Sequence, residues 1–219
     1  MISVCVAGAT GWTGSAVAEA VIDADDLRLA SAVARRSAGT DLGEAWGREP
    51  LGVRVHASVA DALEGVDVLV DYTSHQQARE IALTAIEHGV NVVIGSSGLT
   101  SEIYAQIDDA ARERNVGVVA AGNFSLTAAM AQAAALLVAR HLPQWEIVDY
   151  ASATKPDVPS GTARELADRL GEIRHPEIGR ELRDITGPVE ARGATVSGSQ
   201  VHSVRLPSFT VSTEVVFGL

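Results

Sequence analysis

Short apolar segments alternate with amphipathic segments along roughly the first half of the chain. The apolar segments are rich in β-branched residues and predict strands, whereas the segments between them have the apolar period of helices. The predicted strands are Ile2–Ala7, Leu27–Val33, Val66–Tyr72, Val90–Ile94 and Val116–Ala121. The predicted helices are Trp12–Ile22, Gln76–Glu87 and Glu102–Arg114. Strands that alternate with helices and are apolar almost throughout indicate a parallel, doubly wound sheet.

The pattern changes near residue 127. A helix over Thr127–His141 has apolar residues all round, so we expect it to be mostly buried. A strand over Glu146–Ala153, a helix over Gly161–Leu170 and two extended segments, Ala194–Leu206 and Phe209–Phe217, follow. Strands without helices between them favour a mixed or antiparallel sheet. The sequence therefore predicts an α/β fold with a Rossmann-type parallel sheet over residues 1–124 and an α+β domain over residues 125–219.

The composition and net charge of the chain exclude several classes of function. The chain has 219 residues, of which 47% are hydrophobic and 21% charged, as in ordinary globular proteins. A net charge of −11 disfavours binding to nucleic acid or to an anionic membrane surface. No apolar run approaches the ~20 residues that cross a bilayer, and no export signal is present. The single cysteine, Cys5, fits a reducing cytoplasm, and the six histidines have no metal-ligand spacing, so we predict no metal.

A glycine-rich turn separates the first predicted strand from the first helix. Its glycines are Gly8, Gly11 and Gly14, and Trp12 and Thr13 lie between them. Glycines in this position let the backbone approach a pyrophosphate closely, while the new helix directs its N-terminus at the phosphates. The motif predicts a dinucleotide site, in which Trp12 stacks on the cofactor or merely staples the loop; the alternative is a plain tight turn.

The second motif places Lys155 shortly before a Ser160-Gly161-Thr162 turn that opens a helix. Free backbone N–H groups, two hydroxyls and the positive end of the helix dipole suit a carboxylate or phosphate, and the lysine adds a mobile positive charge. The same residues would also make an ordinary helix cap beside a solvated lysine.

Two arginines, Arg35 and Arg36, follow the second predicted strand. In a Rossmann site an acid at this place binds the ribose 2′-hydroxyl, whereas an arginine accommodates the 2′-phosphate. We therefore expect the protein to prefer NADPH over NADH. Asp71 is expected to fix the loop after its strand by hydrogen bonds, and His202 to be a satisfied core or interface histidine.

The motifs and their order resemble the dihydrodipicolinate reductase family, also called 4-hydroxy-tetrahydrodipicolinate reductase, of lysine and diaminopimelate biosynthesis. The resemblance rests on Gly8–Gly14, Asp71-Tyr72-Thr73 (Asp-Phe-Thr in the family), Val93–Gly98, Asn123-Phe124-Ser125, Lys155–Ala163 and Val201–Pro207. The run from Lys155 to Ala163 is highly specific, whereas the glycine turn is shared by many nucleotide-binding proteins.

The resemblance implies a cytoplasmic NAD(P)H-dependent reductase of a small cyclic dicarboxylate, assembled through its C-terminal sheet as a homotetramer or homodimer. Lys155 is then the catalytic residue, and the substrate-binding set is Lys155, Ser160, Gly161, Thr162 and Ser97. The cofactor-binding set is Gly8, Gly11, Trp12, Thr13, Arg35, Arg36, Tyr72, Thr73, Gly95, Ser97, Gly122 and Phe124. Family chains normally continue through a strand and a helix that return to the nucleotide domain, so we expect a tail to be missing or shortened here.

The chain departs from the family at the two adjacent histidines that precede the lysine motif, where it has Ala151 and Ser152. Alanine cannot transfer a proton, and a serine hydroxyl is a poor acid near neutral pH. Either Lys155 or a water donates the proton, or the enzyme is slow, or the substrate differs. The hypotheses are the family's own reductase, a paralogous reductase of another imine or enamine carboxylate, and a non-catalytic nucleotide-binding homologue.

Overall fold

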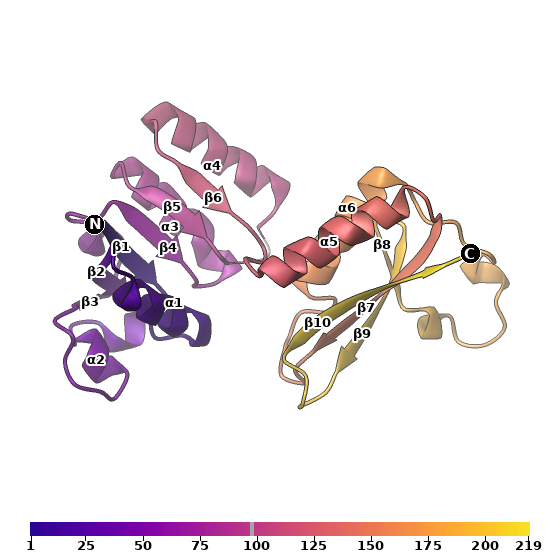
Figure 1. Ribbon diagram of the computed structural model, residues 1–219, viewed down its shortest axis with the longest axis horizontal. Helices are drawn as coiled ribbons and strands as arrows, with labels where there is room; N and C mark the ends of the chain where they lie inside the picture. The colour runs from indigo at the N-terminus through magenta and orange to yellow at the C-terminus, as the bar shows by residue number, and fades with distance from the viewer. Residues whose placement is uncertain (97–98) are drawn as a thin grey trace. The chain divides into compact units, whose positions relative to one another are not determined.

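The structure is a computed structural model that describes residues 1–96 and 99–219 of the chain (Figure 1). It consists of two compact units, Met1–Ala121 and Gly122–Leu219. Each unit has its own sheet and its own hydrophobic core. No helix in the described ranges is long and apolar enough to cross a membrane.

The first unit contains a six-stranded parallel sheet in the order β3-β2-β1-β4-β5-β6. Its strands are β1 (Ile2–Ala7), β2 (Leu27–Val33), β3 (Val55–His56), β4 (Val68–Asp71), β5 (Asn91–Ile94) and β6 (Val118–Ala120). The five predicted strands are confirmed, three of them with shorter ends, and so is the parallel, Rossmann-type arrangement. Strand β3 has two residues at the sheet edge, too few for an apolar pattern to reveal it.

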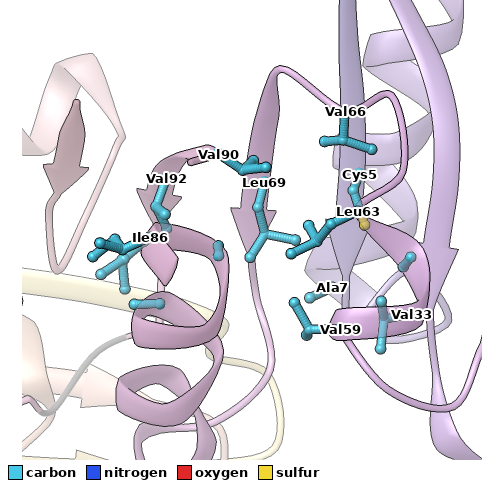
Figure 2. Packing of buried hydrophobic residues seen from close by; sticks show 14 of the residues in the cluster. Cys5, Ala7, Val33, Val59, Leu63, Val66, Leu69, Ile86, Val90 and Val92 are labelled. Atoms are coloured by element: carbon cyan, nitrogen blue, oxygen red, sulfur yellow. The ribbon is translucent and has the colours of Figure 1, made fainter. Parts of the chain in front are cut away.

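Helices cover both faces of this sheet because alternate side chains of each strand point to opposite sides. They are α1 (Trp12–Asp23), α2 (Leu42–Ala45), α3 (His75–Glu87) and α4 (Ser101–Arg114), with two 3₁₀ turns, η1 (Arg35–Ser37) and η2 (Ala60–Ala62). Val4 and Val6 join the cluster that includes α1. Cys5 and Ala7 join the cluster that includes α3, which Figure 2 shows. Burial raises the pKa of the Cys5 thiol to about 11, so the thiol stays protonated at neutral pH.

The second unit contains a mixed sheet in the order β10-β7-β9-β8, in which only β7 and β9 run parallel. Its strands are β7 (Gln144–Ala151), β8 (Ala194–Val196), β9 (Ser199–Arg205) and β10 (Val211–Gly218), and its helices are α5 (Leu126–Ala139), α6 (Gly161–Ile173), η3 (Leu182–Asp184) and η4 (Val189–Arg192). Buried side chains of β7, including Trp145 and Ile147, pack with those of α6, which contacts three of the strands. The predicted α+β fold is confirmed.

Two predictions for this unit were wrong. The segment expected to extend unbroken over Ala194–Leu206 is a hairpin, because Ser197 and Gly198 both adopt positive φ angles and form its two-residue turn. Helix α5 is mostly exposed in the single chain: only Ala135 and Ala139 are buried. A helix that is apolar all round buries only the side that meets a neighbour, and the main neighbour of α5 is α6.

Candidate active site

The glycine turn after β1 is shaped by two positions that have no room for a side chain. Gly8 has a φ of 85°, and a Cβ there would overlap the Tyr72 carbonyl. A Cβ at Gly14 would overlap the Gly8 carbonyl, so helix α1 can approach the turn only with glycine there. The indole Nε1 of Trp46 donates to the Ala9 carbonyl at 3.0 Å and holds the turn from the other side. The N-cap residue, Gly11, offers no side-chain cap, which leaves the first N–H groups of α1 to a ligand.

A groove of about 910 Å³ opens at this turn, and Gly8, Gly11, Arg35, Arg36, Tyr72 and Thr73 contribute to its lining. It lies beside β1 and β4, the two central strands at which the connections of the sheet change direction. Open α/β sheets bind ligands at that switch point, outside the carboxyl ends of the strands. Volume, glycine turn and position therefore fit a dinucleotide.

The residues after the carboxyl end of β4, Tyr72 and Thr73, also line the groove. Asp71 Oδ1 accepts hydrogen bonds from the Thr73 hydroxyl at 2.6 Å and from the Thr73 N–H at 3.2 Å, so Asp71 fixes this loop as expected. The Tyr72 ring lies where a Cβ of Gly95 would be, which makes glycine necessary at position 95. Partial burial raises the pKa of Tyr72, so its hydroxyl is protonated at neutral pH.

The other predicted cofactor residues are spread over both units. Trp12 is 85% exposed at the start of α1, and Thr13 beside it is also exposed. Gly122 and Phe124 belong to the second unit, where Phe124 is exposed, and Ser97 lies outside the described residues. Their contacts with cofactor or substrate stay predictions.

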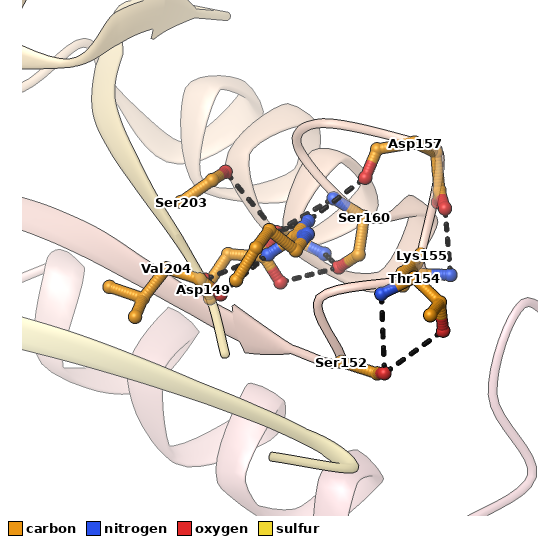
Figure 3. A network of polar contacts seen from close by, with 10 residues as sticks. Asp149, Ser152, Thr154, Lys155, Asp157, Ser160, Ser203 and Val204 are labelled. Carbon is orange, nitrogen blue, oxygen red and sulfur yellow. Dashed lines mark hydrogen bonds and ion pairs between the residues drawn. The ribbon is translucent and has the colours of Figure 1, made fainter. Parts of the chain in front are cut away.

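The second unit contains the lysine motif in a loop between β7 and α6 (Figure 3). Lys155 is the only lysine of the chain. Its Nζ lies 2.8 Å from Asp157 Oδ1, and both side chains are about one-third exposed, at 34% and 30%. Before it, the Ser152 carbonyl accepts from the Lys155 N–H at 3.0 Å, and the hydroxyls of Ser152 and Thr154 lie 3.0 Å apart.

Asp149, on β7, is fully buried below this loop and receives hydrogen bonds from two directions. Ser160 donates its N–H to Oδ2 at 2.8 Å and its hydroxyl to Oδ1 at 2.7 Å. Arg205, at the end of β9, donates Nη2 to Oδ2 at 2.7 Å and also to the Asp157 carbonyl at 2.9 Å. Burial by itself would raise the pKa of Asp149, but the contacts with Arg205 and Ser160 outweigh it and hold the pKa below its ordinary value.

These contacts determine what the Ser-Gly-Thr turn can offer a ligand. The Ser160 hydroxyl caps α6 by accepting from the Ala163 N–H at 3.2 Å while it donates to Asp149, so it is already engaged. Within the described ranges, the half-buried Thr162 hydroxyl has no hydrogen-bond partner. Gly161 and Thr162 are the first two residues of α6, whose N–H groups have no partner within the helix. An anion-binding group of one lysine, two N–H groups and one hydroxyl results.

The two positions where the family has histidines are not equivalent in the structure. Ala151 is fully buried at the end of β7, whereas Ser152 is half-buried at the start of the loop. His202 has a partner, as expected: its Nε2 lies 2.7 Å from Glu146 Oε2, and Arg192 pairs with the other Glu146 oxygen. Outside residues 97–98, no three His, Cys, Asp or Glu side chains gather to hold a metal.

Two family models match the chain, dihydrodipicolinate reductase N-terminus over residues 2–124 and C-terminus over residues 122–219. The chain belongs to the dihydrodipicolinate reductase family. It is 34% identical to the 4-hydroxy-tetrahydrodipicolinate reductase of Desulfitobacterium hafniense over 99% of this chain and 82% of that one. Identity to the reductase of Moorella thermoacetica is 36%, with the same two coverages. A dipicolinate-bound dihydrodipicolinate reductase from Paenisporosarcina sp. TG-14 superposes with a TM-score of 0.79 at 28% identity, covering 100% of this chain and 84% of that one.

Sequence reasoning missed the residues that support the family's motifs. Asp149 had no signal of its own, because an acid in a strand is ordinarily a solvent-facing residue. Arg205 lay inside a quoted family segment but received no role, and Trp46 lay in a stretch without a predicted element. The Trp46–Ala9 and Asp149–Arg205 contacts join residues 37 and 56 positions apart, which no local pattern reveals.

The Asp149 network predicts a defined pH dependence of stability. Removing one partner of a buried pair costs about 3–5 kcal/mol, so Asp149→Asn should destabilise the second unit by that order. The stabilisation belongs to the ionised form, whose pKa is depressed, so it is fully present above the ordinary pKa of 3.8 and is lost as pH falls below it.

Urea unfolding can be followed by Trp145 fluorescence in a Trp12→Phe, Trp46→Phe background. The difference in unfolding free energy between the parent and Asp149→Asn should stay constant from pH 7 to 5 and shrink below about pH 4. A difference that persists unchanged to pH 3 would show that the carboxylate charge does not matter.

Proposed function

We propose that this protein is the NAD(P)H-dependent reductase of 4-hydroxy-tetrahydrodipicolinate in lysine and diaminopimelate biosynthesis. The observation that carries the proposal is the anion-binding group formed by Lys155, Gly161 and Thr162, held from below by Asp149. A cyclic dicarboxylate presents the kind of group that these residues bind. The names of the curated relatives and the dipicolinate bound in the solved relative support the same substrate class.

Cofactor binding falls to the first unit and substrate binding to the second. The groove beside Gly8 and Gly11 binds the nicotinamide cofactor, which supplies the hydride when bound. The second unit binds the substrate: Lys155 and the N–H groups of Gly161 and Thr162 hold one carboxylate. Reduction also needs a proton. Because Ala151 and Ser152 stand at the histidine positions, we assign its donation to the ammonium group of Lys155.

The substrate role of Lys155 predicts a specific kinetic defect. Lys155→Ala should lower kcat/KM by about 30- to 1,000-fold, corresponding to the ~2–4 kcal/mol of one lost charge-assisted contact, and leave cofactor affinity unchanged. Lys155→Arg keeps the charge but cannot release a proton near neutral pH, so it should recover affinity for dipicolinate without recovering kcat. Steady-state kinetics with the upstream synthase, pyruvate and aspartate semialdehyde, followed by NADPH absorbance, measure both variants.

The Ser152→His variant distinguishes the proposed function from its alternative, a paralogous reductase that needs no histidine acid. Ala151 and Ser152 favour that alternative. The variant should raise turnover of the dipicolinate-type substrate if that is the natural one, and change nothing on a different substrate. If Lys155→Ala leaves dipicolinate binding and the kinetics unchanged, the loop only caps helix α6 and the proposal is refuted.

We also propose that NADPH is preferred. Arg35 and Arg36 are exposed in η1 at the groove, and neither has an ion-pair partner in the described part of the chain. Replacing either by alanine should weaken NADPH binding by about tenfold, near the lower end for charge-assisted hydrogen bonds, and leave NADH binding within twofold. Fluorescence titration at low salt tests this, with Arg112→Ala, an exposed partner of Asp108 on α4, as the control. Equal losses for both cofactors would contradict the preference.

We further propose a homo-oligomer, a tetramer or a dimer, built on the second unit's sheet in the cytoplasm. The face of this sheet opposite Trp145 and Ile147 carries Val148 and the exposed Val216, and lacks the lysines that blunt open sheets. Val216→Asp should therefore reduce the mass measured by light scattering at micromolar concentration. A monomer mass for the unaltered chain would contradict the proposal.

A further inference from the structure

Lys155 already has a carboxylate beside it. The nearest acid is Asp157, two residues further along, and the 2.8 Å distance between Nζ and Oδ1 is that of a hydrogen-bonded ion pair (Figure 3). A substrate carboxylate on the same ammonium would need the place that Asp157 Oδ1 occupies.

Asp157 also interacts with the N–H group of Gly161 at the start of α6, the second part of the anion-binding group. Burial by itself would raise the pKa of Asp157, but Lys155 together with the backbone N–H groups of Asp157 and Gly161 outweighs it and lowers the pKa. The Asp157 side chain is therefore ionised at neutral pH, and it faces both Lys155 and a donor at the start of α6. These are two of the groups proposed to hold the substrate.

The two acids of this loop differ in how firmly they are held. Asp149 is fully buried and accepts hydrogen bonds from Ser160 and Arg205. Moving its side chain away would leave the Arg205 charge without its partner. The Asp157 side chain is about one-third exposed. Arg205 donates to the backbone carbonyl of Asp157 at 2.9 Å and so anchors the main chain, whereas the Asp157 carboxylate is held by its pair with Lys155.

We infer that Asp157 is an internal competitor of the substrate carboxylate: its side chain occupies Lys155 until a dicarboxylate displaces it. Asp157 thereby sets the affinity of the site and excludes weaker anions. The inference rests on the proposed function, because it assumes that Lys155 receives a substrate carboxylate. Asp157 therefore opposes substrate binding at Lys155 and does not support it.

Removal of the competing charge should tighten binding. Asp157→Asn should bind pyridine-2,6-dicarboxylate about two- to tenfold more tightly than the unaltered protein, since a partly exposed ion pair is weak and its displacement costs correspondingly little. Pyridine-2-carboxylate, with a single carboxylate, should gain by a similar factor, because only one carboxylate site is relieved. Calorimetric titration with NADPH present gives both dissociation constants.

Two further variants make the result specific. Asp184→Asn removes the same charge from an exposed acid of the second unit, so it should leave both dissociation constants unchanged. Lys155→Ala tests the underlying function: if it does not weaken binding, the proposed site itself is wrong. If Lys155→Ala weakens binding but Asp157→Asn leaves it unchanged or weaker, Asp157 supports the lysine and the inference fails. Equal tightening in Asp184→Asn would also overturn it. Asp157→Ala, which retains the anchored backbone carbonyl, repeats the test if the asparagine variant folds poorly.

Discussion

One buried carboxylate, that of Asp149, holds the loop of Lys155 in place. An ionised acid out of contact with water is costly unless hydrogen bonds and a counter-charge replace its solvation. Here the main chain and hydroxyl of Ser160 and the guanidinium of Arg205 do so. These donors come from a helix N-terminus and from the end of another strand. Satisfying one charge therefore brings β7, β9 and α6 together and directs the first turn of α6 toward the loop of Lys155.

The cofactor groove depends on a different constraint, the absence of side chains. Gly8 and Gly14 allow helix α1 to begin against the end of β1, and Gly95 leaves room for the Tyr72 ring at the end of β5. Close backbone approach matters here because the ligand's phosphates must reach N–H groups directly. The groove of the first unit thus depends on glycines that leave the backbone accessible, whereas the Lys155 loop of the second unit depends on the buried charge of Asp149.

Most of the fold and part of the site could be predicted from the sequence, because these parts depend on local patterns. The strands around Gly8 and the helix cap at Ser160 follow from period and turn residues, whereas the hairpin turn at Ser197 and Gly198 was missed. The Asp149–Arg205 contact joins residues 56 positions apart, and no local pattern encodes it. The pairing of Lys155 with Asp157 is local, yet sequence alone does not say whether an acid near a lysine supports or opposes a ligand.

The proposed carboxylate site does not depend on Ala151 and Ser152, where the family has histidines, because none of its anion-binding groups comes from those positions. The proposed displacement of Asp157 from Lys155 by a substrate carboxylate can be seen directly in a crystal structure of the protein with NADPH and pyridine-2,6-dicarboxylate. We expect one carboxylate on Lys155 Nζ and the N–H groups of Gly161 and Thr162, with the Asp157 side chain turned away. A ligand bound elsewhere, or Asp157 still paired with Lys155 beside a bound ligand, would contradict it.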